Sequence, residues 1–373
     1  MPDQLLTLNA GSSSIKYALF DPTAGLAKPV LTGQVDGIGT RSGPANHEAA
    51  LASVLLRLPP DSIRAVGHRV VHGGALFGEP RALDDDVLAD IEALTPLAPL
   101  HQPHNLAGVH AARLAFPGVP QVACFDTAFH RDAPLVNQHF ALPEVWFDRG
   151  IRRYGFHGLS YESIVAQLAA DPSVPRGRVV IAHLGNGASM AAVRDGRPVA
   201  TTMSFSPLDG LPMGTRCGRL DAAVVLHLIR QEGLSVDQVS QLLHRESGLL
   251  GLSGVSSDMR ELLAADNAGA RLAIDYFVEQ VLRELAGMAA ALRGLDTLVF
   301  TGGIGENAAA LRARIVEGAA WMGLRLDVRG NSCRMPRISA HDSRVDVRVL
   351  RTNEESVIAR HTARITGLHA ASP

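Results

Sequence analysis

The chain has 373 residues, of which 46% are hydrophobic and 19% charged, and its formal net charge at neutral pH is -2. A chain of this length exceeds one average hydrophobic core, so we expect two domains. The nearly balanced charge argues against a nucleic-acid-binding protein and against attachment to an anionic membrane. The three cysteines, Cys124, Cys217 and Cys333, are scattered and odd in number. This pattern argues against a disulfide framework or a zinc site and fits a reducing cytoplasm.

The N-terminal sequence MPDQLLTLNA has no basic segment followed by an apolar stretch, and no apolar run approaches the roughly 20 residues of a membrane span. We therefore expect neither export nor membrane insertion. Strand-like and helix-like segments alternate along the chain, as in IRAVGHRVVHGG (63–74) followed by LDDDVLADIEALTPLAPL (83–100). This alternation predicts an α/β protein with mainly parallel sheets.

The first predicted element is a strand, turn and strand at residues 5–21, LLTLNAGSSSIKYALFD. Its turn combines a glycine, three serines and Lys16. Backbone N–H groups and hydroxyls that face one spot suit a phosphate or another oxyanion. The alternative is that these residues serve only the dihedral angles of a tight turn. The Walker pattern G-x-x-x-x-G-K-[ST], which would decide between the two, is absent.

A second unit of the same kind follows at residues 179–195, VVIAHLGNGASMAAVRD. Each copy reads apolar strand, small polar turn, apolar strand and aspartate. The similarity favours a duplicated domain with a cleft between the halves. The superposition pairs Gly11 with Gly185, Ser12 with Asn186, and Asp21 with Asp195.

Four charged or titratable side chains stand out in the stretches between and after these units. Arg69 lies in GHRVVHGG, Asp126 in CFDTAFH, His157 in RRYGFHGLSY and Arg216 in GLPMGTRCGRLD. We expect Ser160 to cap the helix that follows His157. Singly, such residues are usually buried ion pairs or satisfied core histidines. Because all four lie outside regular helices, together they favour one charged site, where the planar fork of arginine suits carboxylate and phosphate alike.

A third glycine-rich site lies in LDTLVFTGGIGENAAALRARI (295–315), which predicts a strand and then a helix. The positive N-terminal end of that helix would face an anion or a nucleotide. The segment GIGENA also fits G-x-G-x-x-[GA], so a Rossmann dehydrogenase with Asp327 on a ribose hydroxyl is a rival interpretation. Against it, too few residues follow to form a full doubly wound half.

Nine motifs in order along nearly the whole chain together resemble the acetate kinase family. The resemblance implies the sugar kinase, Hsp70 and actin superfamily, with two similar ribonuclease H-like α/β domains and a cleft between them. It implies reversible in-line transfer of the γ-phosphate of ATP to acetate, giving acetyl phosphate and ADP, with Mg²⁺ or alternatively Mn²⁺, by a cytoplasmic homodimer. The motifs are NAGSSSIK, GHRVVHGG, FDTAFH, RYGFHG, HLGNG, PLDGLPMGTRCG, SSDMRE, FTGGIGEN and TNEE.

The same resemblance assigns domains and residue roles. Residues 1–149 with 357–373 would form the acyl-substrate and phosphate domain, and residues 150–356 the nucleotide-binding domain. Asn9 and Glu354 match the metal positions. The catalytic group would comprise Arg69, which binds the substrate, the active-site Asp126, and the transition-state stabilisers His157 and Arg216. The remaining matches are the acetate-methyl pocket of Val71, Leu100, Phe156 and Pro207, and the nucleotide site of Lys16, His183, Leu184, Gly185, Asn186, Gly187, Asp258, Met259, Arg260, Gly303, Ile304, Gly305, Glu306 and Asn307.

The chemistry makes physical sense of this set. A carboxylic acid with a pKa of about 4 is ionised at neutral pH, so the nucleophile needs no strong general base. The difficulty is electrostatic, because a carboxylate anion must approach a polyanionic phosphate. Cations must then stabilise the negative charge on the phosphoryl oxygens during the transfer. We therefore expect Asp126 to orient an arginine or a metal-bound water. Two alternatives stay open: a nucleotide-binding module without kinase activity, and propionate or butyrate as the acceptor.

Overall fold

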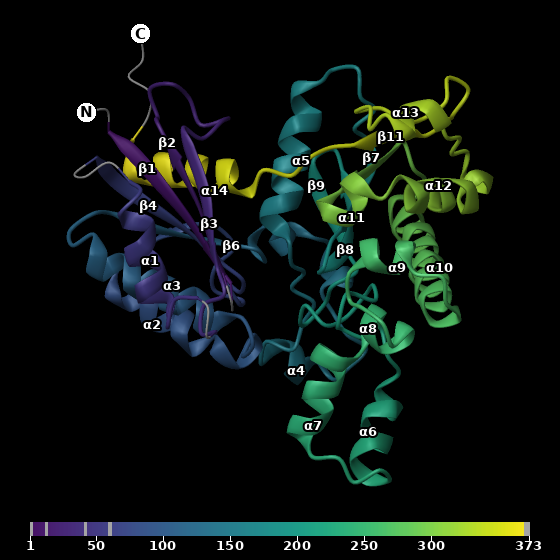
Figure 1. Ribbon diagram of the computed structural model, residues 1–373, viewed down its shortest axis with the longest axis horizontal. Helices are drawn as coiled ribbons and strands as arrows, with labels where there is room; N and C mark the ends of the chain where they lie inside the picture. Colours follow the sequence, from purple (N-terminus) through teal and green to yellow (C-terminus); the bar gives the residue numbers. More distant parts are fainter. Residues whose placement is uncertain (1–2, 12–13, 41–42, 59–61, 369–373) are drawn as a thin grey trace. The chain divides into compact units, whose positions relative to one another are not determined.

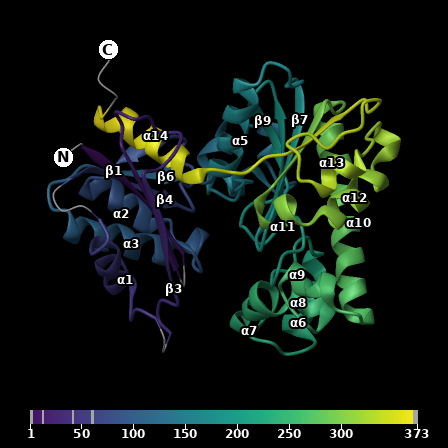
Figure 2. The same ribbon diagram turned by 45° about the horizontal axis from the view of Figure 1, so that its top comes forward.

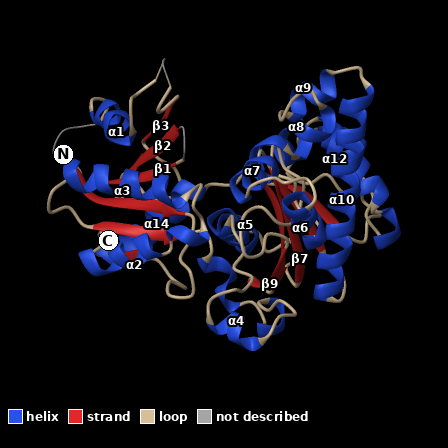
Figure 3. Ribbon diagram, turned by 90° about the horizontal axis from the view of Figure 1, so that it is seen from below, coloured by secondary structure: helices blue, strands red, loops and turns tan. Residues whose placement is uncertain are grey.

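The structure is a computed structural model that describes residues 3–11, 14–40, 43–58 and 62–368. The serines Ser12 and Ser13 of the first turn lie outside the described residues. The chain divides into two compact units. Unit 1 comprises Met1–Arg131, Gly158–Ser163 and Asn353–Pro373, and unit 2 comprises Asp132–His157 and Ile164–Thr352. Each unit contains one sheet flanked by helices, so the α/β class is confirmed (Figures 1 and 3). The predicted domain limits and domain roles stay a prediction.

The sheet of unit 1 has the strand order β3-β2-β1-β4-β6-β5. Strand β1 runs antiparallel to β2 and parallel to β4, and β4 runs parallel to β6. The central strands are buried on both faces, which explains their nearly continuous apolar sequences. The strands are β1 (Gln4–Ala10), β2 (Ser14–Phe20), β3 (Leu31–Asp36), β4 (Ile63–Val70), β5 (Arg81–Ala82) and β6 (Gln121–Phe125).

The sheet of unit 2 has the order β9-β8-β7-β10-β11, which repeats β3-β2-β1-β4-β6 of unit 1 with the same directions. The first strand starts at Gln4 in unit 1 and at Arg178 in unit 2, and the second strand starts at Ser14 and at Ala188. The two units are therefore separated by the same number of residues at both strands. The predicted duplication is therefore confirmed. The prediction of mainly parallel sheets is wrong, because the first three strands of each unit form an antiparallel meander. The strands are β7 (Arg178–Leu184), β8 (Ala188–Arg194), β9 (Arg197–Thr201), β10 (Thr297–Thr301) and β11 (Asp346–Val349).

Helices cover both faces of the unit 1 sheet, as the side-chain alternation of β1 requires. Leu6 and Leu8 pack in one cluster with residues of α1 and α3, whereas Leu5 packs with Ala359 and Ala363 of α14. The C-terminal helix α14 therefore lies against the N-terminal strands, opposite α1 and α3 (Figures 1 and 2). This position brings the start of α14 to unit 1. The helices are α1 (His47–Leu55), α2 (Asp85–Ala93), α3 (Gln102–Ala115) and α14 (Glu354–Thr366).

The remaining helices all follow β6 in the sequence, and the longest of them, α10, packs along β8 and β7. Its start is capped by Asn267, whose side chain accepts a hydrogen bond from Ala270 N–H. Among the described residues, every helix is too short or too polar to cross a membrane. These helices are α4 (Glu144–Asp148), α5 (Gly158–Ala170), α6 (Ala222–Arg230), α7 (Val236–Gln241), α8 (Gly248–Ser253), α9 (Met259–Ala264), α10 (Ala268–Leu292), α11 (Gly302–Asn307), α12 (Ala309–Gly318) and α13 (Val328–Ser332).

Candidate active site

A polar cluster lies at one edge of the unit 1 sheet, where the neighbouring strands β1, β4 and β6 end. Asn9 is on β1, Arg69 is on β4, and Asp126 directly follows β6. Because these strands are parallel, their carboxyl ends meet at the same edge. Arg69 donates from Nε to both carboxylate oxygens of Asp126, at 3.2 and 3.1 Å, and also from Nη2. Its Nη1 donates to Asn9 Oδ1 at 3.2 Å, so one guanidinium joins two of the predicted site residues.

Glu354 completes this cluster from the start of α14. Its carboxylate lies 4.0 Å from Arg69 Nε. Burial raises the pKa of Glu354 and the charge of Asp126 raises it further, while Arg69 opposes both. Burial alone would lower the pKa of Arg69, but the carboxylates of Asp126 and Glu354 raise it above its ordinary value. Arg69 is therefore a permanent cation held by oxygen atoms.

The backbone around Asp126 leaves it little freedom. Its N–H donates to Val70 O at 3.0 Å, and its carbonyl accepts from Gly158 N at 2.9 Å. A Cβ on Gly158 would come within 2.1 Å of that carbonyl, so this close approach requires glycine. The Asp126 side chain is 1% exposed, against 20% for Arg69. The aspartate thus faces the arginine, and only the arginine reaches solvent.

Three other predicted residues belong to unit 1, namely Lys16, Val71 and Leu100. Lys16 is the cross-strand neighbour of Asn9 and is exposed. Val71 is buried, and its N–H donates to Asn105 Oδ1 at 2.9 Å. Leu100 is half-buried, just before α3. Asn105 is a partner that sequence reasoning did not identify, because nothing in its helical surroundings marks it.

The donor set of the cluster suits a hard cation. Asn9, Glu354 and Asp126 offer amide or carboxylate oxygens, which are the ligands that Mg²⁺ prefers. Within the described residues there is no group of three or more His, Cys, Asp or Glu placed to hold a metal. A metal bound by Asn9 and Glu354 would therefore have few protein ligands. This fits Mg²⁺, which keeps several waters and binds substrate phosphates.

In unit 2, two predicted side chains meet beside the turn after β7. His157 adopts a left-handed backbone (φ 58°), and its Nδ1 lies 2.8 Å from Ser189 Oγ. Its ring stacks on that of His183 with centroids 4.3 Å apart. A Cβ placed on Gly187 would lie 3.3 Å from His157 Nε2 and 3.8 Å from Arg216 Nη1. The glycine therefore leaves room where a histidine and an arginine converge.

The backbone of the loop before α6 holds Arg216. Its Nη1 donates to Pro207 O at 2.9 Å and lies 3.4 Å from Met213 Sδ. Pro207 and Phe156 are both buried. These two residues belong to unit 2, whereas Val71 and Leu100 belong to unit 1. The four-residue pocket for the acetate methyl therefore stays a prediction.

A cavity of about 780 Å³ in unit 2 gathers eight of the predicted nucleotide residues. They come from the turn after β7, the start of α9, and α11. Lys16, His183, Leu184, Gly187, Gly305 and Glu306 do not line it. Ser257, Leu263, Ala308 and Arg334 line it although the sequence did not identify them. The predicted residues in its wall are Gly185, Asn186, Asp258, Met259, Arg260, Gly303, Ile304 and Asn307.

The geometry of α11 explains the glycines of the third motif. Gly302 has φ 78°, and a Cβ there would lie 2.8 Å from Leu184 O, so only glycine allows α11 to start this close to β7. A Cβ on Gly303, by contrast, would meet nothing within 4 Å. Glu306 accepts from Gly302 N–H at 3.1 Å, and burial raises the pKa of its carboxyl. Glu306 thus supports the start of α11, whereas Gly303 faces open space.

The dinucleotide interpretation of this motif is wrong. Asp327 is the cap of α13, and its side chain accepts from Gly330 N–H at 3.0 Å. Within the described part of the chain, β11 is the one strand that follows β10 in the sheet, and the other strands β7, β8 and β9 form an antiparallel meander. The expected cap of α5 is also wrong. The helix begins at Gly158 after His157, and Ser160 lies inside its first turn.

Comparison with known proteins places the chain among phosphotransferases. The model of the Acetokinase family matches residues 43–360. An acetate kinase of Methylocella silvestris is 49% identical, over 99% of this chain and 99% of its own length. The crystal structure of a propionate kinase from Francisella tularensis has a TM-score of 0.92 and 36% identity, covering 97% of this chain and 100% of its own. That of Porphyromonas gingivalis acetate kinase has a TM-score of 0.87 and 36% identity, covering 97% and 99%.

Proposed function

The chain belongs to the Acetokinase family, and on that premise we propose that it catalyses reversible in-line transfer of the γ-phosphate of ATP to acetate. The products are acetyl phosphate and ADP. The observation that carries the proposal is the 780 Å³ cavity, whose wall contains residues from three separate motifs of the family. A nucleotide-binding module without kinase activity would not need the charged groups that this chain retains, Arg69, His157 and Arg216.

The residues suit a reaction limited by electrostatics. Acetate is ionised at neutral pH, so no base has to generate the nucleophile. Arg69 would orient the acetate carboxylate, and Asp126 would fix Arg69 through the paired hydrogen bonds. Arg216 and His157 would stabilise charge on the phosphoryl oxygens during transfer. His157 is suited to this because Ser189 fixes one ring nitrogen, and its other nitrogen lies beside Gly187.

We propose Mg²⁺ as the metal, bound by Asn9 and Glu354. When bound, it neutralises phosphate charge. Asn9 supplies an amide oxygen that Arg69 already orients, and Glu354 supplies a carboxylate from the start of α14. The exposed Lys16, opposite Asn9 on β2, would contact a nucleotide phosphate.

The acceptor is tested by hydroxamate formation. Purified protein with ATP, Mg²⁺ and hydroxylamine is compared on acetate, propionate, butyrate and no acid. We expect the highest turnover on acetate, although one methylene changes specificity by only about 1–3 kcal/mol. A preference for a longer acid would keep the chemistry and overturn the small methyl pocket. Absence of product with every acid would overturn the kinase assignment.

We also propose a homodimer that works in the cytoplasm. Helix α6 supports the homodimer, because its sequence AAVVLHLIR is mostly apolar, yet none of its residues is buried. A second copy of the chain would cover this face. Light scattering should give about twice 39.5 kDa, and Leu226→Asp should release the monomer. A monomeric wild-type protein would contradict the dimer without touching the reaction.

A further inference from the structure

Arg312 on α12 is the bulkiest of the fully buried side chains, with 1% of its surface exposed. Among the described residues, no carboxylate forms an ion pair with it. Its guanidinium instead donates to four backbone or amide oxygens. Nη1 donates to Gly305 O at 2.8 Å and Glu306 O at 2.9 Å. Nε donates to Asn331 Oδ1 at 2.8 Å, and Nη2 to Asn331 O at 3.1 Å.

These oxygens do not line the 780 Å³ cavity themselves, but each lies close in the chain to residues that do. Gly305 and Glu306 lie in α11, which lines the cavity through Gly303, Ile304 and Asn307. Asn331 lies in α13, and its carbonyl also accepts from Arg334 N–H at 3.2 Å. Arg334 lines the cavity from a left-handed backbone with φ 54°. One buried guanidinium therefore connects the α11 wall to the turn that presents Arg334.

A core position does not need an arginine. A buried charge without a carboxylate partner is unfavourable, and here burial and the charge of Arg334 both lower the pKa of Arg312. Two features offset the cost. The carbonyls of Gly305 and Glu306 lie at the negative C-terminal end of α11. The planar fork satisfies four oxygens at fixed angles, which a flexible lysine would not do.

We infer that Arg312 is a positioning residue for nucleotide binding: its hydrogen bonds set the spacing between α11 and the turn that carries Arg334. The inference rests on the proposed function of this cavity as the ATP site. Arg312 does not line the cavity, so it acts through the residues that do. Loss of its donors should loosen both walls and weaken nucleotide binding, and should spare acetate binding, which we assign to Arg69 of unit 1.

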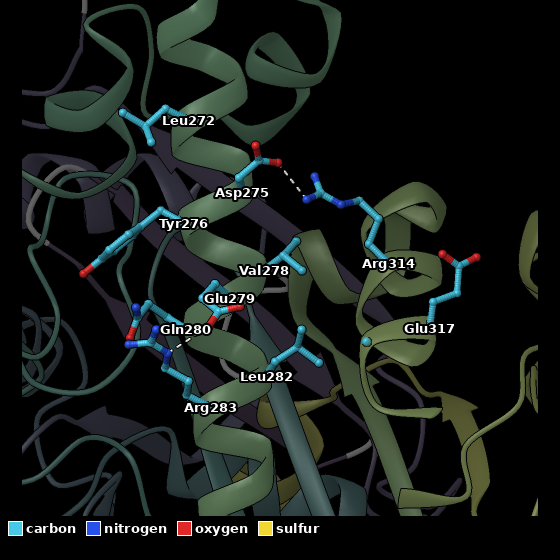
Figure 4. A pocket seen from close by; sticks show the side chains of 11 residues that line it. Leu272, Asp275, Tyr276, Val278, Glu279, Gln280, Leu282, Arg283, Arg314 and Glu317 are labelled. Carbon is cyan, nitrogen blue, oxygen red and sulfur yellow. Dashed lines mark hydrogen bonds and ion pairs between the residues drawn. The ribbon is translucent and has the colours of Figure 1, made fainter. Parts of the chain in front are cut away.

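The test uses Arg312→Met, which keeps an unbranched apolar stem and removes the donors. Arg312→Lys keeps the charge but not the fork. The matched control is Arg314→Met on the same helix. Arg314 lies two residues after Arg312, which places it about 200° away around the helix axis. Its side chain is therefore exposed, and it pairs with Asp275 at 2.7 Å. Figure 4 shows this pair in the groove between α10 and α12, whose lining is separate from the nucleotide cavity.

The readouts are the dissociation constant of ADP by calorimetry and the KM values for ATP and acetate. For Arg312→Met we expect ADP binding to weaken and the KM for ATP to rise, both about tenfold or more, with the KM for acetate within about twofold. Arg312→Lys should fall between Arg312→Met and the wild type. Arg314→Met should match the wild type in all three quantities.

Three results would overturn the inference. If the wild type binds no ADP, the proposed function fails and the inference fails with it. If the wild type binds ADP and Arg312→Met binds it equally well, the function stands and the positioning role is wrong. If affinities for ADP and acetate fall together with the melting temperature, Arg312 has a general structural role only. Should Arg312→Met not fold, Arg312→Lys is judged by the same criteria.

Discussion

Replacing Asp126 by asparagine separates orientation of an arginine from base catalysis. Asn keeps the shape of the side chain and one oxygen acceptor, but it removes the charge that faces Arg69. In the structure, the Arg69 guanidinium reaches both carboxylate oxygens of Asp126, which is 1% exposed. Arg69 would keep a weaker partner in Glu354, at 4.0 Å. The Arg69 guanidinium should therefore keep its average position, but its orientation should vary more.

The size of the effect follows from these contacts. A hydrogen bond to a charged group contributes about 1.5–3 kcal/mol. Because Arg69 is 20% exposed and Glu354 remains, we expect a loss near the lower end, about 2 kcal/mol. At about 1.4 kcal/mol per factor of ten, the KM for acetate should rise roughly thirtyfold. Since acetate is already ionised, kcat should stay within about fivefold of the wild type.

The assay is initial-rate hydroxamate formation with acetate varied at saturating ATP and Mg²⁺. Asp132→Asn serves as the matched control, because Asp132 is exposed and close in sequence. It should leave both kinetic constants unchanged. A fall in kcat of about a hundredfold with an unchanged KM for acetate would refute the reasoning, because it would place Asp126 in the chemical step.

Three further predictions concern other groups. Arg216→Ala should lower kcat by about a thousandfold or more, as loss of a cation on the transferring phosphoryl does, and change the KM for ATP little; a coupled ADP assay that shows less than about a tenfold fall would contradict its role. Glu354→Gln should raise the Mg²⁺ concentration for half-maximal rate about tenfold, whereas Glu355→Gln should not, and equal behaviour of the two variants would argue against Glu354 as a ligand. Burial lowers the pKa of His68 and of His72 from 6.5 to about 4, so the unfolded chain binds more protons between these values. The contribution of the two neutral histidines to the free energy of unfolding is therefore complete above pH 6.5. It decreases towards pH 4, by up to about 1.4 kcal/mol per pH unit for each histidine. Urea unfolding at pH 7, 6 and 5 measures this, and constant stability would show that the two histidines are not held neutral.

Much of the architecture could be predicted because it repeats. The two strand pairs share sequence pattern and length, and the structure gives both units the same strand order. Strand direction was predicted less well, since β8 is buried along most of its length and reads like a parallel strand. The cap of α5 was missed because His157 occupies the cap position in a left-handed backbone, which histidine adopts only occasionally.

Candidate site residues could be named from the sequence where their chemical type or their match to a family motif marks them, whereas the residues that pack against them could not. Arg69, Asp126 and Asn9 come from three distant motifs, and the structure brings them together through hydrogen bonds. Ser189, which contacts His157, is one small residue in an apolar strand and carries no signal. Arg312 looks like an ordinary surface arginine of a helix, and only its burial reveals its contacts. Arg334 depends on a turn whose conformation the sequence does not specify.

The central claim, transfer of phosphate from ATP to acetate, is tested most directly by ³¹P nuclear magnetic resonance of the complete reaction. Purified protein is mixed with ATP, Mg²⁺ and acetate, and the phosphorus signals are followed over time. We predict that acetyl phosphate and ADP appear in equal amounts, that neither forms without acetate, and that Arg216→Ala suppresses both. ADP accompanied only by inorganic phosphate from the start, or no ADP at all, would contradict the account.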